Sequence, residues 1–244
     1  MILYKMTGIV LSLIMILPAA ENESPLLDIS FSRQGPVPGT FSYSISGIDQ
    51  LGQLSGASSI RENTLICSGG GAIIPRSSSV WPQLGNAAQL KIQFMIDSAG
   101  TNARQALFTC GPLMTWPAVF IMTKDSPHYE GKMQFRNPGS GFRHAVTVFL
   151  PHITDAVGWY NMDTLIEAGV WHTITVMFDA QTHTMSCVLD AEHPATIIDP
   201  EFHVRTAFFE NIYIGASGIV PLQSSVKDPF AGKIKSVRIS IGKK

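Results

Sequence analysis

Short apolar runs alternate with clusters of glycine, proline, serine and asparagine from Leu26 to the end of the chain. No stretch keeps a 3.6-residue apolar period over three helical turns, whereas several runs alternate apolar and polar residues with period two. The pattern therefore predicts an all-β protein. The expected strands are residues 26–32, 40–46, 64–69, 88–97, 106–111, 118–124, 132–137, 144–151, 171–179, 184–190, 211–217 and 232–242.

Two of these runs indicate which face each strand buries. In the run 88–97, alternate residues are apolar and the residues between them are mostly polar, which predicts one core face and one wet face. In the run 232–242, the alternation slips by one residue near Ser236, which predicts a β-bulge. Because there are more expected strands than one open sheet usually holds, we expect two packed antiparallel sheets. The apolar residues of the first run are Leu90, Ile92, Phe94 and Ile96.

The chain divides into an N-terminal leader and one domain. Residues 1–20 place Lys5 before a short apolar run and end in Ala19 and Ala20, as a secretory signal peptide does. A retained membrane anchor is the alternative, but spanning a bilayer takes about 20 apolar residues. We expect 21–24 to be a short lead-in and 25–244 one domain, in which 55–79 forms loops around one strand. The protein is then secreted, extracellular or periplasmic, and free of the membrane after cleavage.

Charge and cysteine content narrow the function further. The formal net charge of −1 gives no basic field for a phosphate backbone, which argues against nucleic acid as a partner. The three cysteines, Cys67, Cys110 and Cys187, allow at most one internal disulfide, and the sequence leaves open which two pair, if any. Their spacing lacks a C-x-x-C pair, so a zinc site has little support.

The C-terminal third carries an ordered set of motifs. It opens with Gly-x-Trp-His, continues through a hairpin and an Ile-Gly strand, and closes with Phe-x-Gly-x-Ile-x-x-Val-Arg-Ile. This arrangement resembles the C-terminal half of laminin-G-like domains in the concanavalin A-like lectin/glucanase superfamily. The resemblance implies a jelly-roll sandwich of two antiparallel sheets and a structural role for Trp171. The matching residues are Gly169, Trp171, His172, Asp179, Leu189, Asp190, Ile214, Gly215, Phe230, Gly232, Ile234, Val237, Arg238 and Ile239.

The segment 170–191 is interpreted as a hairpin with its turn at 179–183 and one apolar face. The sequence departs from the family pattern at Ala191, where the hairpin usually carries glycine, and in a longer insertion just before Gly169. That insertion places aromatic and acidic residues beside the sheet edge. The residues of the apolar face are Ile174, Val176, Phe178, Met185, Cys187 and Leu189.

The superfamily hosts enzymes, lectins and adhesion modules, so the fold alone does not assign a reaction. Its glucanases carry carboxylates at period two within one strand, and no such run occurs here. The nearest acidic pairs, Asp190/Glu192 and Asp125/Glu130, lie at turns or loops. The arginine, histidine and tyrosine motifs of the alginate lyases are also missing as a set.

Calcium is the metal ion that the resemblance implies, because the superfamily binds it through loop carboxylates and carbonyls. Asp28, Asp179 and Asp228 are the candidate contributors, although turn capping explains each of them equally well. The histidines are scattered singly, which gives little support to a transition-metal site.

Ligand binding is the use that the sequence favours. Sugar rings stack on aromatic side chains while amides and carboxylates bind their hydroxyls. Two places combine such residues, and the alternative is that their rings cover the ends of the core. The candidate in the segment 77–86 is Trp81. The candidates in the segment 154–163 are Asp155, Trp159, Tyr160, Asn161 and Asp163.

The hypothesis that follows is a secreted, non-catalytic carbohydrate-binding or adhesion module with a glycan or polysaccharide as its partner. One alternative is a glycoside-active hydrolase or lyase that uses an atypical site built from Asp155, Asp163 and Glu130. The other is a structural surface domain that binds another protein through a sheet face.

Overall fold

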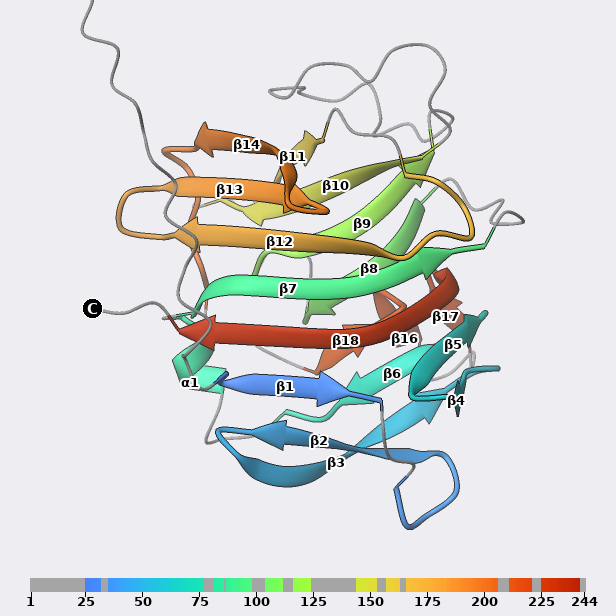
Figure 1. Ribbon diagram of the computed structural model, residues 1–244. Helices are drawn as coiled ribbons and strands as arrows, with labels where there is room; N and C mark the ends of the chain where they lie inside the picture. The colour runs from blue at the N-terminus through green and yellow to red at the C-terminus, as the bar shows by residue number, and fades with distance from the viewer. Residues whose placement is uncertain are drawn as a thin grey trace, which may run out of the picture.

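The computed structural model (Figure 1) describes most of the chain from residue 25 onward, with a few positions described by backbone alone. No helical segment in this part combines the length and the apolar character that crossing a bilayer requires. The expected signal peptide 1–20, the lead-in 21–24 and the expected strand 132–137 lie outside the described residues. The described residues are 25–31, 35–76, 81–85, 87–97, 104–111, 116–123, 144–152, 157–162, 166–205, 211–220 and 225–241.

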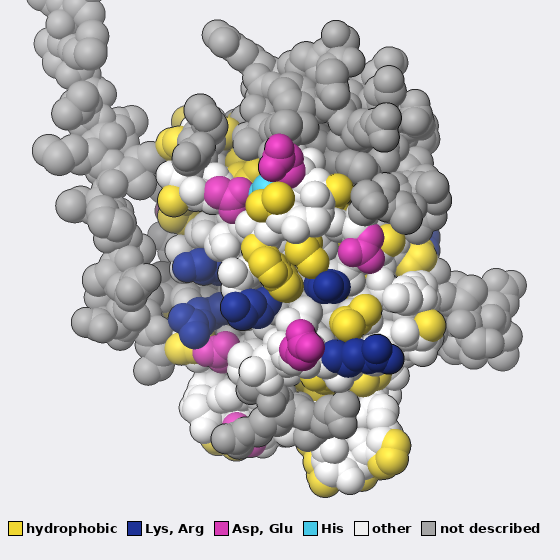
Figure 2. Space-filling model, turned by 45° about the vertical axis from the view of Figure 1, so that its right-hand side comes forward, with side chains coloured by type: hydrophobic (Ala, Val, Ile, Leu, Met, Phe, Trp, Pro, Cys, Tyr) yellow, Lys and Arg dark blue, Asp and Glu magenta, His cyan; other side chains and the backbone are white. Residues whose placement is uncertain are grey.

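The described strands form a two-layer antiparallel sandwich, which confirms the predicted fold class. One layer faces the viewer in Figure 1, and its outer face carries Lys and Arg side chains across the middle, as Figure 2 shows. In order, this layer contains β14 (Glu192–Ile198), β13 (Thr184–Leu189), β12 (His172–Asp179), β7 (Ala87–Ile96), β18 (Ala231–Ile241), β1 (Leu27–Ser30) and β2 (Thr40–Ile45).

The second layer lies behind the first, and β3 (Ile48–Ser55) connects the two by pairing with β2 and with β6. The hydrogen-bonded path is therefore continuous through the sandwich. Beyond β3 the order is β6 (Gly71–Ile74), β15 (Ile212–Ile214), β8 (Arg104–Cys110), β9 (Ala118–Thr123), β10 (His144–Pro151) and β11 (Val157–Asn161).

Smaller elements complete the fold. β5 (Thr64–Ser68) pairs with both β18 and β4 (Ser59–Arg61), and β16 (Gly218–Val220) pairs with β17 (Ser225–Lys227). The helix α1 (Trp81–Leu84) is a single turn. The segment 55–79, which the sequence analysis interpreted as loops around one strand, thus contains β4, β5 and β6, because short strands give too few alternating positions to be recognised.

The main core lies between the layers and is built from the inward residues of alternating strands. In the hairpin β12–β13, Ile174, Val176 and Phe178 face Leu189, Cys187 and Met185 across the register, and all six are buried. The predicted hairpin face is confirmed. The expected bulge is confirmed as well, since the pairing of β18 with β7 shifts between Ile234 and Ser236.

The second layer is buried on both faces in its centre. Val119 and Ile121 of β9 join the main core, whereas Phe120 and Met122 belong to a separate apolar cluster with Phe149 of β10. The rings of Phe120 and Phe149 meet edge to face, with centroids 4.9 Å apart. A continuous apolar run such as that of β9 is what a strand covered on both faces requires.

The three cysteines all lie in the described part of the chain, where they are buried and form no disulfide. Burial raises the pKa of each thiol, because the charged thiolate is poorly solvated in the apolar core. Cys187 is the small apolar core residue that its spacing to Met185 and Leu189 predicts.

Candidate functional site

The predicted ligand-binding insertion falls partly on β11, at one end of the hydrogen-bonded path. The register sets Trp159 opposite Phe149 and Asn161 opposite Thr147 on β10. The side chains of Trp159 and Asn161 lie outside the described residues, as do Asp155 and Asp163 altogether, so their ligand role stays a prediction. Trp81 begins α1, and its side chain is likewise outside the description.

Tyr160 is the one residue of the predicted set whose side chain the structure describes. Only 4% of Tyr160 is exposed, and its hydroxyl donates to Asp199 Oδ2 at 2.5 Å. This burial leaves no exposed ring face on which a sugar could stack. The reason is the alternation of β11, since Tyr160 faces Val148 across the register and points into the core with it.

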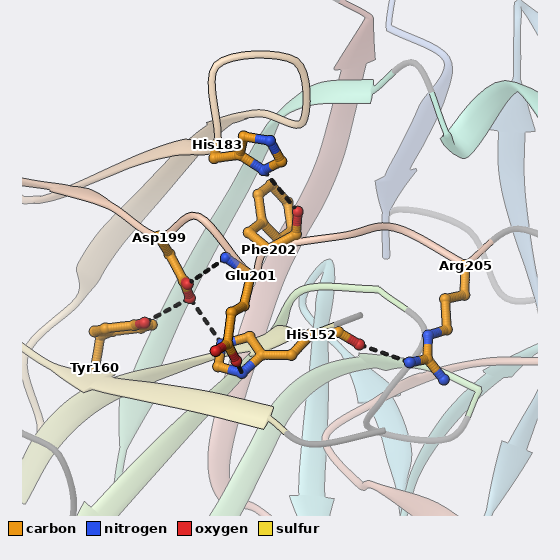
Figure 3. Close-up of polar contacts among 7 residues, drawn as sticks. All are labelled: His152, Tyr160, His183, Asp199, Glu201, Phe202 and Arg205. Carbon is orange, nitrogen blue, oxygen red and sulfur yellow. Dashed lines mark hydrogen bonds and ion pairs between the residues drawn. The ribbon is translucent and has the colours of Figure 1, made fainter. Parts of the chain in front are cut away.

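Tyr160 belongs to a polar group that we call the Asp199 cluster, made of the buried His152, Tyr160 and Asp199 and the exposed Glu201 (Figure 3). His152 Nε2 lies 2.8 Å from Asp199 Oδ2, and His152 Nδ1 lies 3.1 Å from Glu201 Oε2. The other oxygen of Asp199 accepts the backbone N–H of Glu201 at 3.1 Å. Both ring nitrogens of His152 thus face carboxylate oxygens, so a ring N–H on either side has an acceptor.

The Asp199 cluster has a defined charge state. Burial raises the pKa of Asp199, but hydrogen bonds from Tyr160, His152 and the Glu201 N–H outweigh it, so the pKa lies below its ordinary value. Burial and the neighbouring Asp199 carboxylate raise the pKa of Tyr160. At neutral pH, Asp199 is therefore ionised and Tyr160 keeps its proton. A general acid needs a raised pKa, so Asp199 does not suit that role.

These contacts clamp three segments together. His152 follows β10, Tyr160 lies on β11, and Asp199 and Glu201 follow β14. Further bonds support the same junction, from Arg205 Nη2 to the His152 carbonyl at 2.7 Å and between His183 Nδ1 and the Phe202 carbonyl at 3.0 Å. The cluster holds the β10–β11 hairpin, and with it the backbone of the predicted ligand surface.

A second polar site lies at the start of β12, around the buried His172. Its Nδ1 is 2.6 Å from Asp190 Oδ2, and its Nε2 is 3.1 Å from the Glu167 carbonyl. The remaining oxygen of Asp190 accepts the Thr173 N–H at 2.6 Å. Asp190 therefore ties the end of the β12–β13 hairpin to the beginning of β12, and it fixes the loop that precedes His172.

That loop carries exposed apolar side chains. Trp171 is 38% exposed and Val170 is 43% exposed, and the side chain of Asp190 is 41% exposed. Glu167, whose carbonyl lies against His172, is exposed as well. We call Glu167, Val170, Trp171 and Asp190 the Trp171 rim. An exposed indole beside carboxylates can stack on the apolar face of a sugar while the carboxylates accept its hydroxyl protons.

The resemblance implied a structural role for Trp171, and the structure shows that part of its side chain is also accessible at the surface. One pattern in the sequence indicates the exposure of Trp171. His172 begins a strand whose burial alternates, with His172, Ile174 and Val176 inward, so the preceding residue falls on the outward side.

The three aspartates considered for calcium are separately engaged. Asp179 caps its turn by accepting from the Gln181 N–H at 2.8 Å, and Asp28 accepts from Arg238 Nη2 at 2.9 Å. Asp228 receives two bonds from Arg104, at 3.0 and 2.9 Å. In the described part of the chain, no three His, Cys, Asp or Glu side chains group as metal ligands. The aspartates therefore do not fit a shared calcium site, and turn capping accounts for Asp179.

Comparison with known proteins places the fold. No family model matches the sequence, and no curated protein matches it either. The solved CBM40 of the Ruminococcus gnavus IT-sialidase, bound to alpha2,3 sialyllactose, has a TM-score of 0.51 and 15% identity, over 73% of this chain and 91% of that one. The botulinum neurotoxin serotype D binding domain has a TM-score of 0.60 and 9% identity, over 90% of this chain and 49% of that one.

The chain thus spans about half the length of the toxin domain and nearly all of the sialidase module. At these identities the likeness is one of fold. It establishes that the chain has a β-sandwich fold shared with sialidase and toxin binding domains.

Proposed function

We propose that the protein is a secreted, non-catalytic carbohydrate-binding module that holds a sugar on the Trp171 rim. The observation that carries this proposal is the 38% exposure of Trp171, which directly precedes the His172 that the partly exposed Asp190 binds. An indole that is accessible at the surface offers an apolar face, and sugar rings stack on such faces. The insertion with Trp159 and Asn161 is the second proposed contact surface for the same class of ligand.

The fold supports this proposal. One neighbour of the same fold is a carbohydrate-binding module bound to a sialyllactose, which makes a glycan the first ligand class to test. The sequence also lacks a strand with carboxylates at period two, the arrangement that glycoside cleavage uses in related folds. The leader-like segment 1–20 supports export.

We also infer kinship with laminin-G-like domains. Ala191, which stands where that pattern carries glycine, has a φ of 61°. This left-handed backbone explains why glycine suits the position, because it lacks the Cβ that disfavours such a φ.

A glycan array tests the binding proposal, probed with the mature chain in calcium and in chelator. We expect retention of one glycan class, and about tenfold or greater weakening in Trp171→Ala, because stacking aromatics contribute strongly at such sites. Ile48→Ala is the matched control, since Ile48 is 65% exposed on the distant strand β3. Absence of binding to the array in both conditions, or equal binding by wild type and Trp171→Ala, contradicts the proposal for the rim.

A further inference from the structure

The outer face of the first layer concentrates positive charge along two adjacent strands. Lys91 lies on β7, and Lys233, Lys235 and Arg238 lie on β18; we call these four residues the basic band. Lys91, Lys235 and Arg238 are exposed, and Lys233 is half-buried. Figure 2 shows several Lys and Arg side chains on this face at the level of β7 and β18, with acidic and apolar side chains between some of them.

The register forces two of these cations together. Arg238 is the direct cross-strand partner of Lys91, so like charges face each other on the same side of the sheet. Such pairs are unfavourable in the free protein. Asp28 of β1 pairs with Arg238 at 2.9 Å, which leaves the other three cations without an acidic counterpart on the outward positions of β1, β7 and β18.

The charge is local to this face. The whole chain has a formal net charge of −1, so the basic band does not follow from a generally basic protein. A cluster of one sign on a neutral molecule attracts oppositely charged partners to that face, and salt weakens the attraction.

Uncharged hydrogen-bonding side chains lie beside Lys91 on β7 and β12, whereas the half-buried Met95 and Ile66 lie opposite Lys233. Thr175 of β12 is opposite Lys91, and Thr173 is opposite Gln93. The large hydrophobic side chains exposed in the described part of the chain lie elsewhere, and none is on β7 or β18. A membrane-binding face would combine basic residues with apolar ones that enter the lipid. Hydroxyl and amide groups beside cations instead suit a hydroxyl-rich polyanion.

We propose that the basic band binds an anionic polysaccharide, whose sulfate or carboxylate groups lie across β7 and β18. Opposite residues on neighbouring strands are about 5 Å apart, and alternate residues along a strand are about 7 Å apart. The cations can therefore meet charged groups along a chain of substituted sugars. This surface goes beyond the Trp171 rim, because its binding rests on charge and not on stacking.

The test compares dextran sulfate with unsubstituted dextran of the same length, so that only the charge differs. Binding is measured by calorimetry with the mature chain at low and at moderate salt. We expect dextran sulfate to bind, and we expect moderate salt to weaken its binding. Any binding of unsubstituted dextran should be the same in the wild type and in variants of the basic band. Lys91→Gln/Lys235→Gln should bind at least tenfold more weakly, since each lost charge near an anionic surface costs about fivefold.

Arg76→Gln/Lys227→Gln is the matched control, because it removes two exposed cations that lie off the basic band, after β6 and on β17. Circular dichroism checks that all variants remain folded. Loss of binding in the first variant with retention in the control supports the proposal. No binding of dextran sulfate by the wild type, or equal weakening in both variants, overturns it. Binding to phosphatidylserine vesicles without binding to dextran sulfate also overturns it, in favour of a lipid surface.

Discussion

The hydroxyl of Tyr160 has a structural partner in the described residues, the buried carboxylate of Asp199. Its position beside Trp159 and Asn161, in an aromatic and polar insertion, had predicted that Tyr160 faces a ligand. Neighbours on a strand point to opposite faces, however, so Tyr160 and the positions on either side of it cannot share one surface. At the scale of single residues, the predicted site therefore separates into Tyr160, a core residue, and two neighbouring positions that belong to the opposite face of the sheet.

Tyr160→Phe removes this phenolic donor and keeps the ring. We expect the free energy of unfolding at pH 7 to fall by about 1–3 kcal/mol, because a buried carboxylate loses a hydrogen bond. Urea denaturation measures the change, with Tyr43→Phe as the control for a core tyrosine away from the Asp199 cluster.

The difference between wild type and Tyr160→Phe should shrink in acid. The pKa of Asp199 is lowered in the folded protein, so its contribution is complete above the ordinary carboxyl pKa and is lost as pH falls through the folded value. A difference that stays constant down to about pH 2, well below the ordinary aspartate pKa, would argue against a bond to the ionised carboxylate.

At the scale of elements, the β12–β13 hairpin shows what the local pattern of apolar and polar residues can predict. Its face, its turn and the bulge of β18 agree with the sequence analysis because each depends on residues close in the chain. The strands β3 and β14 were not recognised. β3 exposes most of its residues and β14 contains Pro194, so neither offers the alternation that marks a strand.

Gly232 marks a close approach of β18 to its neighbours. A Cβ at this position would lie 2.2 Å from the Met95 carbonyl oxygen and 2.7 Å from the Phe230 ring. We expect Gly232→Ala to destabilise the protein by about 1–3 kcal/mol, because backbone and a buried ring must shift. Thermal unfolding measures this loss of stability, and Ser236→Ala at the bulge of the same strand is the control. Unchanged stability in Gly232→Ala would show that β18 can move away from β7.

At the scale of the whole molecule, the two layers depend on each other. A continuous hydrogen-bonded path runs through both, and one core cluster contains residues of β7, β12 and β18 together with residues of β8, β9 and β10. Neither layer can bury its inner face without the other. This interdependence agrees with the expectation of one domain over 25–244, which remains a prediction.

We therefore expect the mature chain to unfold in one cooperative transition. Far-ultraviolet circular dichroism and tryptophan fluorescence should give the same midpoint in urea, as they do when no intermediate is populated. Two separated midpoints would mean that part of the sandwich unfolds independently.

The sequence by itself determined the all-β class, the inward face of the run 88–97 and the hairpin at 170–191. These features follow from alternation and turn residues, which act over a few neighbouring positions. The tertiary structure alone decided which distant residues meet. His152 and Asp199 are 47 positions apart, and Lys91 faces Arg238 only because β7 pairs with β18. Strand order sets such contacts, and no local pattern encodes it, so the Asp199 cluster and the basic band became visible only in the folded chain.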